Sequence, residues 1–231
     1  MAENYDLIVI GGGSAGLVAA GGAGILGARV MLVEKRGRLG GDCLYTGCVP
    51  SKTLIASARF AAEAKRAADF GFEIQGFGFK DDSFASITGR VRRVIETIEE
   101  RDAPEVFRAM GVEVVLGTPQ FINSREIEIK LKDTGETKKI KAKRFCLTTG
   151  SRPAAAPVEG LRETGFITNE PVFEIEDLPK RLVVLGGGAI GVELGQAFCR
   201  LGSRVTILEA SSRILSKEDE DISTAVENFL R

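Results

Sequence analysis

The 231-residue sequence contains no histidine. This absence excludes Ser-His-Asp and Cys-His catalytic sites from the chain, together with zinc sites that use an imidazole ligand. Only four cysteines are present, too few for a secreted fold of this size held together by disulfides. In a reducing compartment a close pair of cysteines more often serves catalysis or metal binding.

Long apolar runs and an excess of one charge are lacking too. No apolar segment reaches the roughly 18 residues of a membrane helix, and the N-terminus has no signal-peptide pattern, so we expect a cytoplasmic protein without a membrane partner. The 31 basic and 32 acidic residues give a net charge of −1. Such a balance offers no basic surface for nucleic acid, and it favours small-molecule partners.

A glycine-rich turn follows the first apolar run. Residues 5–10 predict a strand, residues 11–16 a tight turn, and the residues to about Leu26 a helix; a second strand over 29–33 ends at Glu34. In dinucleotide sites the glycines permit the turn, the approach of a pyrophosphate and helix packing, and the acid accepts ribose hydroxyls. An ordinary glycine turn is the alternative. The candidate cofactor-binding residues are Gly11, Gly13, Ser14, Ala15, Gly16, Glu34 and Lys35.

The same pattern recurs at a constant offset of 175 residues, with strands predicted over 182–185 and 205–208 and a helix over 192–201. A period this long fits two nucleotide-binding domains rather than a solenoid. An acid at the end of the second strand prefers a free 2′-hydroxyl, so FAD or NAD is expected rather than NADP, although Arg213 leaves some tolerance of NADP open. The second set of candidates comprises Gly186, Gly188, Ala189, Ile190, Gly191 and Glu209.

Two cysteines, Cys43 and Cys48, lie close together between these motifs. Pro50 predicts the start of a long helix to about residue 72, and a helix N-terminus with Lys52 one turn on would stabilise a Cys48 thiolate. We interpret the pair as a redox-active dithiol; a purely structural disulfide is the alternative. No metal site is expected, because the other two cysteines, Cys146 and Cys199, form no second close pair, and we expect both to be buried and unreactive.

Between the motifs, residues 71–82 read as a loop and residues 83–110 as helical, with Pro104 interrupting a helix or beginning a new one. Short strands are predicted over 111–117, 121–122, 126–132, 138–143 and 144–149, with a hairpin turn at 133–136. The predicted fold class is α/β, with two Rossmann-like dinucleotide-binding domains. We expect residues 1–153 to form the first of these domains and residues 154–231 to form the first half of the second. The second domain is incomplete, because strand 182–185 would keep an exposed edge.

These motifs, with Gly41 to Lys52, Thr149 to Pro153 and Glu193, resemble the class I pyridine nucleotide-disulfide oxidoreductases, a family that includes dihydrolipoamide dehydrogenase, glutathione reductase and mercuric reductase. The resemblance covers the whole chain. It implies that residues 1–153 are the FAD domain, that residues 154–231 belong to the NAD domain, and that NAD(P)H reduces FAD, with NAD(H) preferred on the argument from the acids above. Electrons would then pass through a Cys43–Cys48 disulfide to a small disulfide or metal-thiol substrate.

The resemblance also implies roles for individual residues. Cys48 would face the flavin, Cys43 would meet the substrate, and Lys52 would pair with Glu193; a simple surface pair is the alternative. We expect the full-length protein to be a homodimer. Further FAD contacts implied by the resemblance are Gly41, Asp42, Cys43, Lys52, Gly117, Thr149 and Gly150.

Two features depart from the family pattern. Asp42 replaces a small hydroxyl residue; an acid there should oppose thiolate formation at Cys43 and repel anionic substrates, which argues against glutathione. The sequence also ends before the family's interface domain with its His-Glu pair. We therefore expect little turnover from this chain alone. The alternative is a catalytically incomplete FAD- or NAD-binding module, and the cysteine pair argues against a flavin oxidase or peroxidase.

Overall fold

The computed structural model describes residues 4–76, 78 and 83–231. Two compact units divide the chain: residues up to 49 with 93–153, and residues 50–92 with 154 onward. Each unit holds one glycine motif. The functional division after residue 153 stays a prediction, and part of the predicted loop over 71–82 lies outside the described residues.

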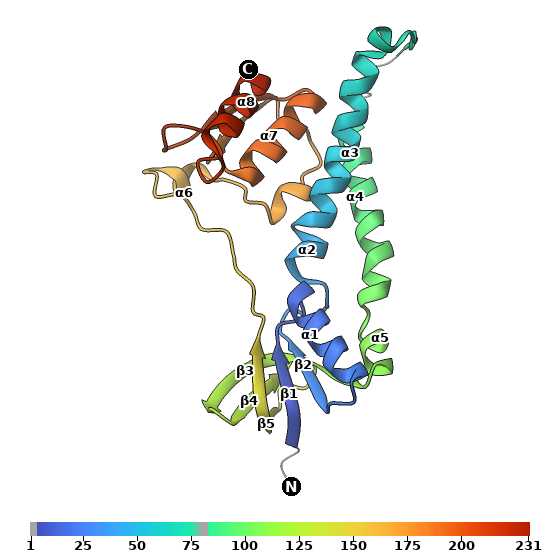
Figure 1. Ribbon diagram of the computed structural model, residues 1–231, viewed down its shortest axis with the longest axis vertical. Helices are drawn as coiled ribbons and strands as arrows, with labels where there is room; N and C mark the ends of the chain where they lie inside the picture. The colour runs from blue at the N-terminus through green and yellow to red at the C-terminus, as the bar shows by residue number, and fades with distance from the viewer. Residues whose placement is uncertain (1–3, 77, 79–82) are drawn as a thin grey trace. The chain divides into compact units, whose positions relative to one another are not determined.

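The first unit is built on a closed ring of five strands (Figure 1). Strand β1 (Asn4–Ile10) pairs in parallel with both β2 (Val30–Glu34) and β5 (Thr137–Leu147), and β2 pairs in parallel with β3 (Val112–Asn123). Strand β4 (Glu126–Leu131) runs antiparallel to β3 and β5 and closes the ring. The parallel strands carry the first glycine motif at their carboxyl ends.

Strands β3 and β5 are longer than predicted, because each joins two segments that the sequence pattern separates. Strand β3 pairs with β2 as far as Leu116 and with β4 from Gly117 onward. Strand β5 pairs with β4 up to Lys141 and with β1 through Leu147. A side chain at Gly117 would place its Cβ 2.6 Å from the carbonyl oxygen of Lys130, so the change of partner requires glycine there.

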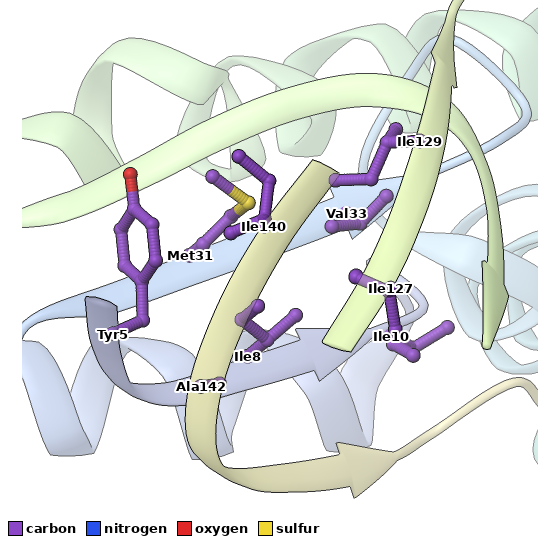
Figure 2. Close-up of a cluster of buried hydrophobic side chains, with 9 residues drawn as sticks. All are labelled: Tyr5, Ile8, Ile10, Met31, Val33, Ile127, Ile129, Ile140 and Ala142. Atoms are coloured by element: carbon purple, nitrogen blue, oxygen red, sulfur yellow. The ribbon is translucent and has the colours of Figure 1, made fainter. Parts of the chain in front are cut away.

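Apolar residues cover both faces of the parallel strands. Figure 2 shows the cluster inside the ring, formed by Tyr5, Ile8, Ile10, Met31, Val33, Ile127, Ile129, Ile140 and Ala142. On the opposite face, α1 (Ser14–Ile25) and α5 (Pro104–Ala109) cover a second cluster of Val9, Leu17, Ala20, Val30, Leu32, Leu39, Phe107, Val112 and Val114. Burial on both faces explains why β1 and β2 read as nearly continuous apolar runs rather than as alternating patterns.

Two helices cross the boundary between the units. Helix α3 (Cys48–Lys65) is followed by the 3-10 helix η1 (Ala67–Phe70), and α4 (Ser83–Glu99) by η2 (Glu100–Asp102). The predicted long helix is therefore confirmed, although it begins two residues before Pro50 and ends at Lys65, earlier than the predicted end at about residue 72. Pro104 begins the new helix α5, which was one of the two alternatives. Within the second unit α3 and α4 lie side by side, since the Arg90 guanidinium donates to the carbonyl oxygen of Thr53 at 3.1 Å.

The remainder of the second unit is a parallel pair of strands, β6 (Arg181–Leu185) and β7 (Arg204–Leu208), with α7 (Ala189–Leu201) between them in sequence. Two short elements, α6 (Leu161–Thr164) and η3 (Pro171–Phe173), precede the pair, and α8 (Glu220–Leu230) follows it. The strand–helix–strand order in both units confirms the α/β fold class. Within the described ranges, no helix combines the length and the apolar composition needed to cross a membrane.

Two thiols differ from expectation. Helix α7 buries one face through Ala197, Phe198 and Leu201, and the Phe198 ring lies 5.8 Å from that of Phe84. Cys199 lies on the other face and is exposed, while Cys146 in β5 is only partly buried. The expectation of burial was wrong for Cys199, because this residue lies on the side of α7 opposite Ala197, Phe198 and Leu201, and it holds only in part for Cys146.

Candidate functional site

The first glycine turn joins β1 to α1 by contacts that only glycine allows. Gly11 has φ +108°, and a Cβ there would lie 2.3 Å from the carbonyl oxygen of Thr148. A Cβ on Gly16 would lie 1.8 Å from the oxygen of Gly11. At Gly13, by contrast, the nearest atom to a Cβ would be the Gly41 Cα at 3.6 Å, so its lack of a side chain leaves space beside the turn.

Glu34 at the end of β2 is fixed by backbone groups. Its Oε2 accepts from the Gly12 N–H at 2.7 Å, and its Oε1 accepts from the Arg36 N–H at 2.6 Å. The side chain is buried. Each carboxylate oxygen has a further lone pair that can accept a ribose hydroxyl.

The second turn repeats this geometry. Glu209 accepts from the N–H groups of Gly187 at 2.6 Å and Ser211 at 2.7 Å, the positions equivalent to Gly12 and Arg36 at the 175-residue offset. Gly186 has φ +107°, and a Cβ on Gly191 would lie 2.1 Å from the carbonyl oxygen of Gly186. The bonds from Ser211 and then Gly187 lower the pKa of Glu209, which favours the charged carboxylate.

Helices α1 and α7 begin in the same way. Their N-caps, Gly13 and Gly188, supply no side-chain cap, and neither helix has an acid in its first turn. The first N–H groups of a helix have no partner within the helix, and the helix dipole makes this end attractive to anions. The exposed residues at the two helix starts are Ser14, Ala15, Ala189 and Ile190. Each turn therefore offers backbone donors to a phosphate.

A second loop packs on the first glycine turn and carries Cys43. The Gly40 N–H donates to the carbonyl oxygen of Gly12 at 2.8 Å, and a Cβ on Gly41 would lie 2.5 Å from the Gly13 Cα. Helix α2 (Gly41–Tyr45) begins at this point. The dithiol segment thus starts directly at the wall of the first nucleotide turn.

Asp42 lies on the same wall. Its Oδ1 is 2.9 Å from Nη1 of Arg36, and its Oδ2 would be 3.7 Å from a Cβ on Gly150, which follows Thr149 beyond the end of β5. The structure therefore brings Asp42 together with Gly150, and its neighbour Gly41 together with Gly13. Arg36 was not among the sequence candidates, because nothing in a loop of mixed charges indicates which side chains will pair.

The two cysteines lie on successive helices. Cys43 on α2 is partly buried and Cys48, the first residue of α3, is exposed. On α3, Lys52 forms an ion pair with Glu193 of α7, as the resemblance implies. Both side chains are substantially exposed, 61% for Lys52 and 44% for Glu193.

Tyr45, between the two cysteines in sequence, is held by three groups of the first unit. Its hydroxyl lies 2.7 Å from Glu99 Oε1 and 2.8 Å from the carbonyl oxygen of Leu39. The Arg38 guanidinium stacks 3.7 Å from the ring centroid. Burial first, and then the Glu99 carboxylate, raise the pKa of Tyr45. Sequence reasoning assigned no role to Tyr45.

Two candidate residues lie elsewhere. Gly117 sits in β3 against β4, where that strand explains the glycine, and Lys35 is exposed beyond β2. Their contact with a cofactor stays a prediction. Gly12 and Thr148 were missed; for Gly12 the signal was available, since Gly187 stands at the equivalent position of the second motif. Within the described part of the chain, no group of three or more His, Cys, Asp or Glu residues could hold a metal ion.

Known proteins are similar to this chain in sequence and in fold. A mercuric reductase from Streptomyces lividans is 35% identical over 98% of this chain, and a mitochondrial dihydrolipoyl dehydrogenase from Schizosaccharomyces pombe is 34% identical over 98%. The structure of a mutant of RclA from Escherichia coli, described as a Cu(II) complex of an HOCl-induced flavoprotein disulfide reductase, superposes with a TM-score of 0.82 over 99% of this chain at 28% identity. The fold is therefore that of flavoprotein disulfide reductases.

The chain spans less than half of each of these proteins: 47% of the mercuric reductase, 44% of the dihydrolipoyl dehydrogenase and 47% of the RclA chain. Residues 5–231 match the family described as pyridine nucleotide-disulphide oxidoreductase. This chain belongs to the pyridine nucleotide-disulphide oxidoreductase family.

Proposed function

We propose that this chain supplies the FAD site and the redox-active dithiol of a pyridine nucleotide-dependent disulfide reductase. The observation that carries the proposal is the packing of the Cys43 segment on the first nucleotide turn. Gly40 bonds to Gly12, and Cys43 follows three residues later. A dithiol at the wall of a dinucleotide site is suited to exchanging electrons with the cofactor bound there.

FAD fits the first turn. The N-terminus of α1 offers backbone N–H groups to the diphosphate, and Glu34 offers its carboxylate to the ribose hydroxyls. The space beside Gly13 admits the cofactor without a clash from a side chain. When bound, FAD supplies the two-electron chemistry that links a nicotinamide hydride to a disulfide.

NAD(H) is the nucleotide that we propose for the second turn. The Glu209 carboxylate, held in its charged form, favours a free 2′-hydroxyl and repels a 2′-phosphate. The Arg213 guanidinium donates to the carbonyl oxygens of Leu215, Ser216 and Glu218 in its own loop, at 2.9 to 3.2 Å. This guanidinium is therefore already engaged, which supports NAD(H) over NADP(H).

The dithiol would act on substrate by thiol–disulfide exchange. The Cys43 thiolate attacks one sulfur of a substrate disulfide, releases the other sulfur as a thiolate that takes up a proton, and forms a mixed disulfide. The Cys48 thiolate then attacks Cys43, which closes the Cys43–Cys48 disulfide and releases the second product thiol. Lys52, one turn after Cys48 on α3, would favour the Cys48 thiolate through its charge.

The substrate that we propose is a small disulfide or a metal-thiol compound. Relatives named mercuric reductase and dihydrolipoyl dehydrogenase support this class. The Asp42 carboxylate, one residue before Cys43, forms an ion pair with Arg36, and this pairing weakens the argument from its charge against an anionic disulfide such as glutathione. We further propose a homodimeric full-length protein in the cytoplasm, with neither a nucleic-acid nor a membrane partner.

FAD titration of the purified chain tests the assignment. We expect the bound flavin to lose fluorescence and, after anaerobic two-electron reduction, to show a long-wavelength absorption band from a thiolate beside the flavin. The matched variants are Cys43→Ser, which cannot form the disulfide and should show that band before any reduction, and Cys48→Ser, which should lack it with or without reduction. A chain that does not bind FAD, or a Cys48→Ser variant that keeps the band, contradicts the proposal.

A further inference from the structure

We propose that Arg36 is a specificity-determining residue of the FAD site, where its guanidinium neutralises Asp42 so that a diphosphate can bind beside that carboxylate. The inference rests on the proposed FAD site in the first unit. It assigns a role to Arg36, and it gives a reason why an acid is tolerated at position 42.

Arg36 is held at three points. Its N–H donates to Glu34 Oε1 at 2.6 Å, its carbonyl oxygen accepts from Lys132 Nζ at 2.9 Å, and its Nη1 donates to Asp42 Oδ1 at 2.9 Å. The next residue, Gly37, has φ +89°, and a Cβ there would lie 2.1 Å from Lys132 Nζ. The backbone of Arg36 is thus fixed on both sides, which directs its side chain to Asp42.

Asp42 occupies a position where an uncompensated charge would oppose an anionic ligand. The residue before it packs on Gly13, the N-cap of α1, and its Oδ2 lies near Gly150, which follows Thr149, a neighbour of Gly11 in the same turn. That helix start is the feature that would attract a diphosphate. A bare carboxylate a few ångströms away would repel the same group, since like charges at short range interact strongly outside bulk water.

Pairing with Arg36 removes this conflict without removing the carboxylate. The ion pair brings the net charge of the two side chains to zero, so the carboxylate no longer presents an uncompensated negative charge to a phosphate group. The side chains of Arg36 and Asp42 are 32% and 41% exposed, so solvent and salt screen their charges in part. We therefore expect an effect on affinity on the order of tenfold rather than a complete loss.

The test measures FAD dissociation constants of the purified chain by flavin fluorescence. Arg36→Ala should weaken binding about tenfold, whereas Arg36→Lys, which keeps the charge, should retain most of the affinity. Asp42→Asn alone should change the affinity by less than about threefold, and Arg36→Ala combined with Asp42→Asn should restore binding to within about threefold of wild type. The Arg36→Ala defect should shrink in about 1 M salt.

Arg108→Ala is the matched control, because Arg108 forms an exposed ion pair with Glu105 on α5 of the same unit. It should leave FAD affinity unchanged. Thermal unfolding of each variant without FAD separates a folding defect from a binding defect. Normal FAD binding by Arg36→Ala, or a double variant as weak as Arg36→Ala alone, overturns the inference while leaving the FAD site in place. A wild-type chain that does not bind FAD overturns the proposed function and this inference together.

Discussion

The ammonium group of Lys52 on α3 and the carboxylate of Glu193 on α7 form an ion pair between residues 141 positions apart in sequence. Because both side chains are substantially exposed, we expect a double-mutant cycle with Lys52→Ala and Glu193→Ala to give a coupling free energy of about 0.2–1 kcal/mol. Urea unfolding measures it. A coupling above about 2 kcal/mol would show instead that the pair is a main determinant of stability.

Two glycines of α1 provide a matched pair of substitutions. Gly16→Ala should destabilise the first unit by about 3 kcal/mol or more, because the new Cβ would overlap the carbonyl oxygen of Gly11. Gly22→Ala on the same helix meets no atom within 4 Å and should stabilise it by about 0.5–1 kcal/mol. Circular dichroism during denaturant unfolding distinguishes the two, and equal effects would contradict the turn geometry.

The two acids that fix the glycine turns should differ in their contribution to stability. Glu34→Gln replaces with an amide the carboxylate that accepts hydrogen bonds from two backbone N–H groups. Because this side chain is buried, the substitution should lower the free energy of unfolding by about 1–3 kcal/mol. Glu209→Gln removes the same bonds at a more exposed site and should cost less. The reverse order in thermal unfolding midpoints would be inconsistent with this comparison.

Asp102 and Asp6 predict opposite effects of pH. Burial raises the pKa of Asp102, so ionisation destabilises the fold, and Asp102→Asn should raise the unfolding midpoint at neutral pH. The Lys143 ammonium lowers the pKa of Asp6, so Asp6→Asn should lower that midpoint. For Asp102, wild type and variant should converge below the ordinary aspartate pKa of about 3.9, where the carboxyl is protonated in both folded and unfolded chains. For Asp6 they should converge only at a lower pH, because the pKa of that carboxyl in the folded chain is itself lowered. If the difference in unfolding midpoint between wild type and a variant stayed the same at every pH, the pKa shift of that aspartate would be contradicted.

Tyr45 can be titrated almost in isolation, because the chain has two tyrosines and no tryptophan. In a Tyr5→Phe variant, tyrosinate absorbance reports on Tyr45 alone. Its raised pKa predicts little ionisation at about pH 10, the ordinary midpoint, until denaturant unfolds the chain. Glu99→Gln should lower the pH at which the signal develops, since the carboxylate is one cause of the shift. If Tyr45 of the folded Tyr5→Phe variant ionised with a midpoint near pH 10, the contact between Tyr45 and Glu99 would not form.

Sequence reasoning succeeded where a local pattern has one physical solution. Gly11 and Gly16 were identified because a tight strand-to-helix turn requires glycine, whatever the rest of the fold. The ends of β3 were missed, since a strand that changes partner at Gly117 looks in sequence like two short strands. Cys199 was misjudged because its own apolar character does not reveal which face of α7 is covered.

Side-chain pairs were harder to predict. Arg36 and Asp42 lie within six positions of each other, yet their contact depends on how the loop around Gly37 folds onto Lys132. The contact between Tyr45 and Glu99 depends on where α4 ends. The pairing of Lys52 with Glu193 came from family resemblance, since spacing alone gives no reason to join residues so distant.

The two glycine turns have equivalent hydrogen bonds, so each turn can serve as the comparison for the other within one chain. The position equivalent to Arg36 is Ser211, and the position equivalent to Asp42 is Lys217. The two glycine turns thus resemble each other in backbone geometry but differ in the charged side chains around them. Exchanging these side chains between the two turns would test how the charges around each turn determine which cofactor it binds.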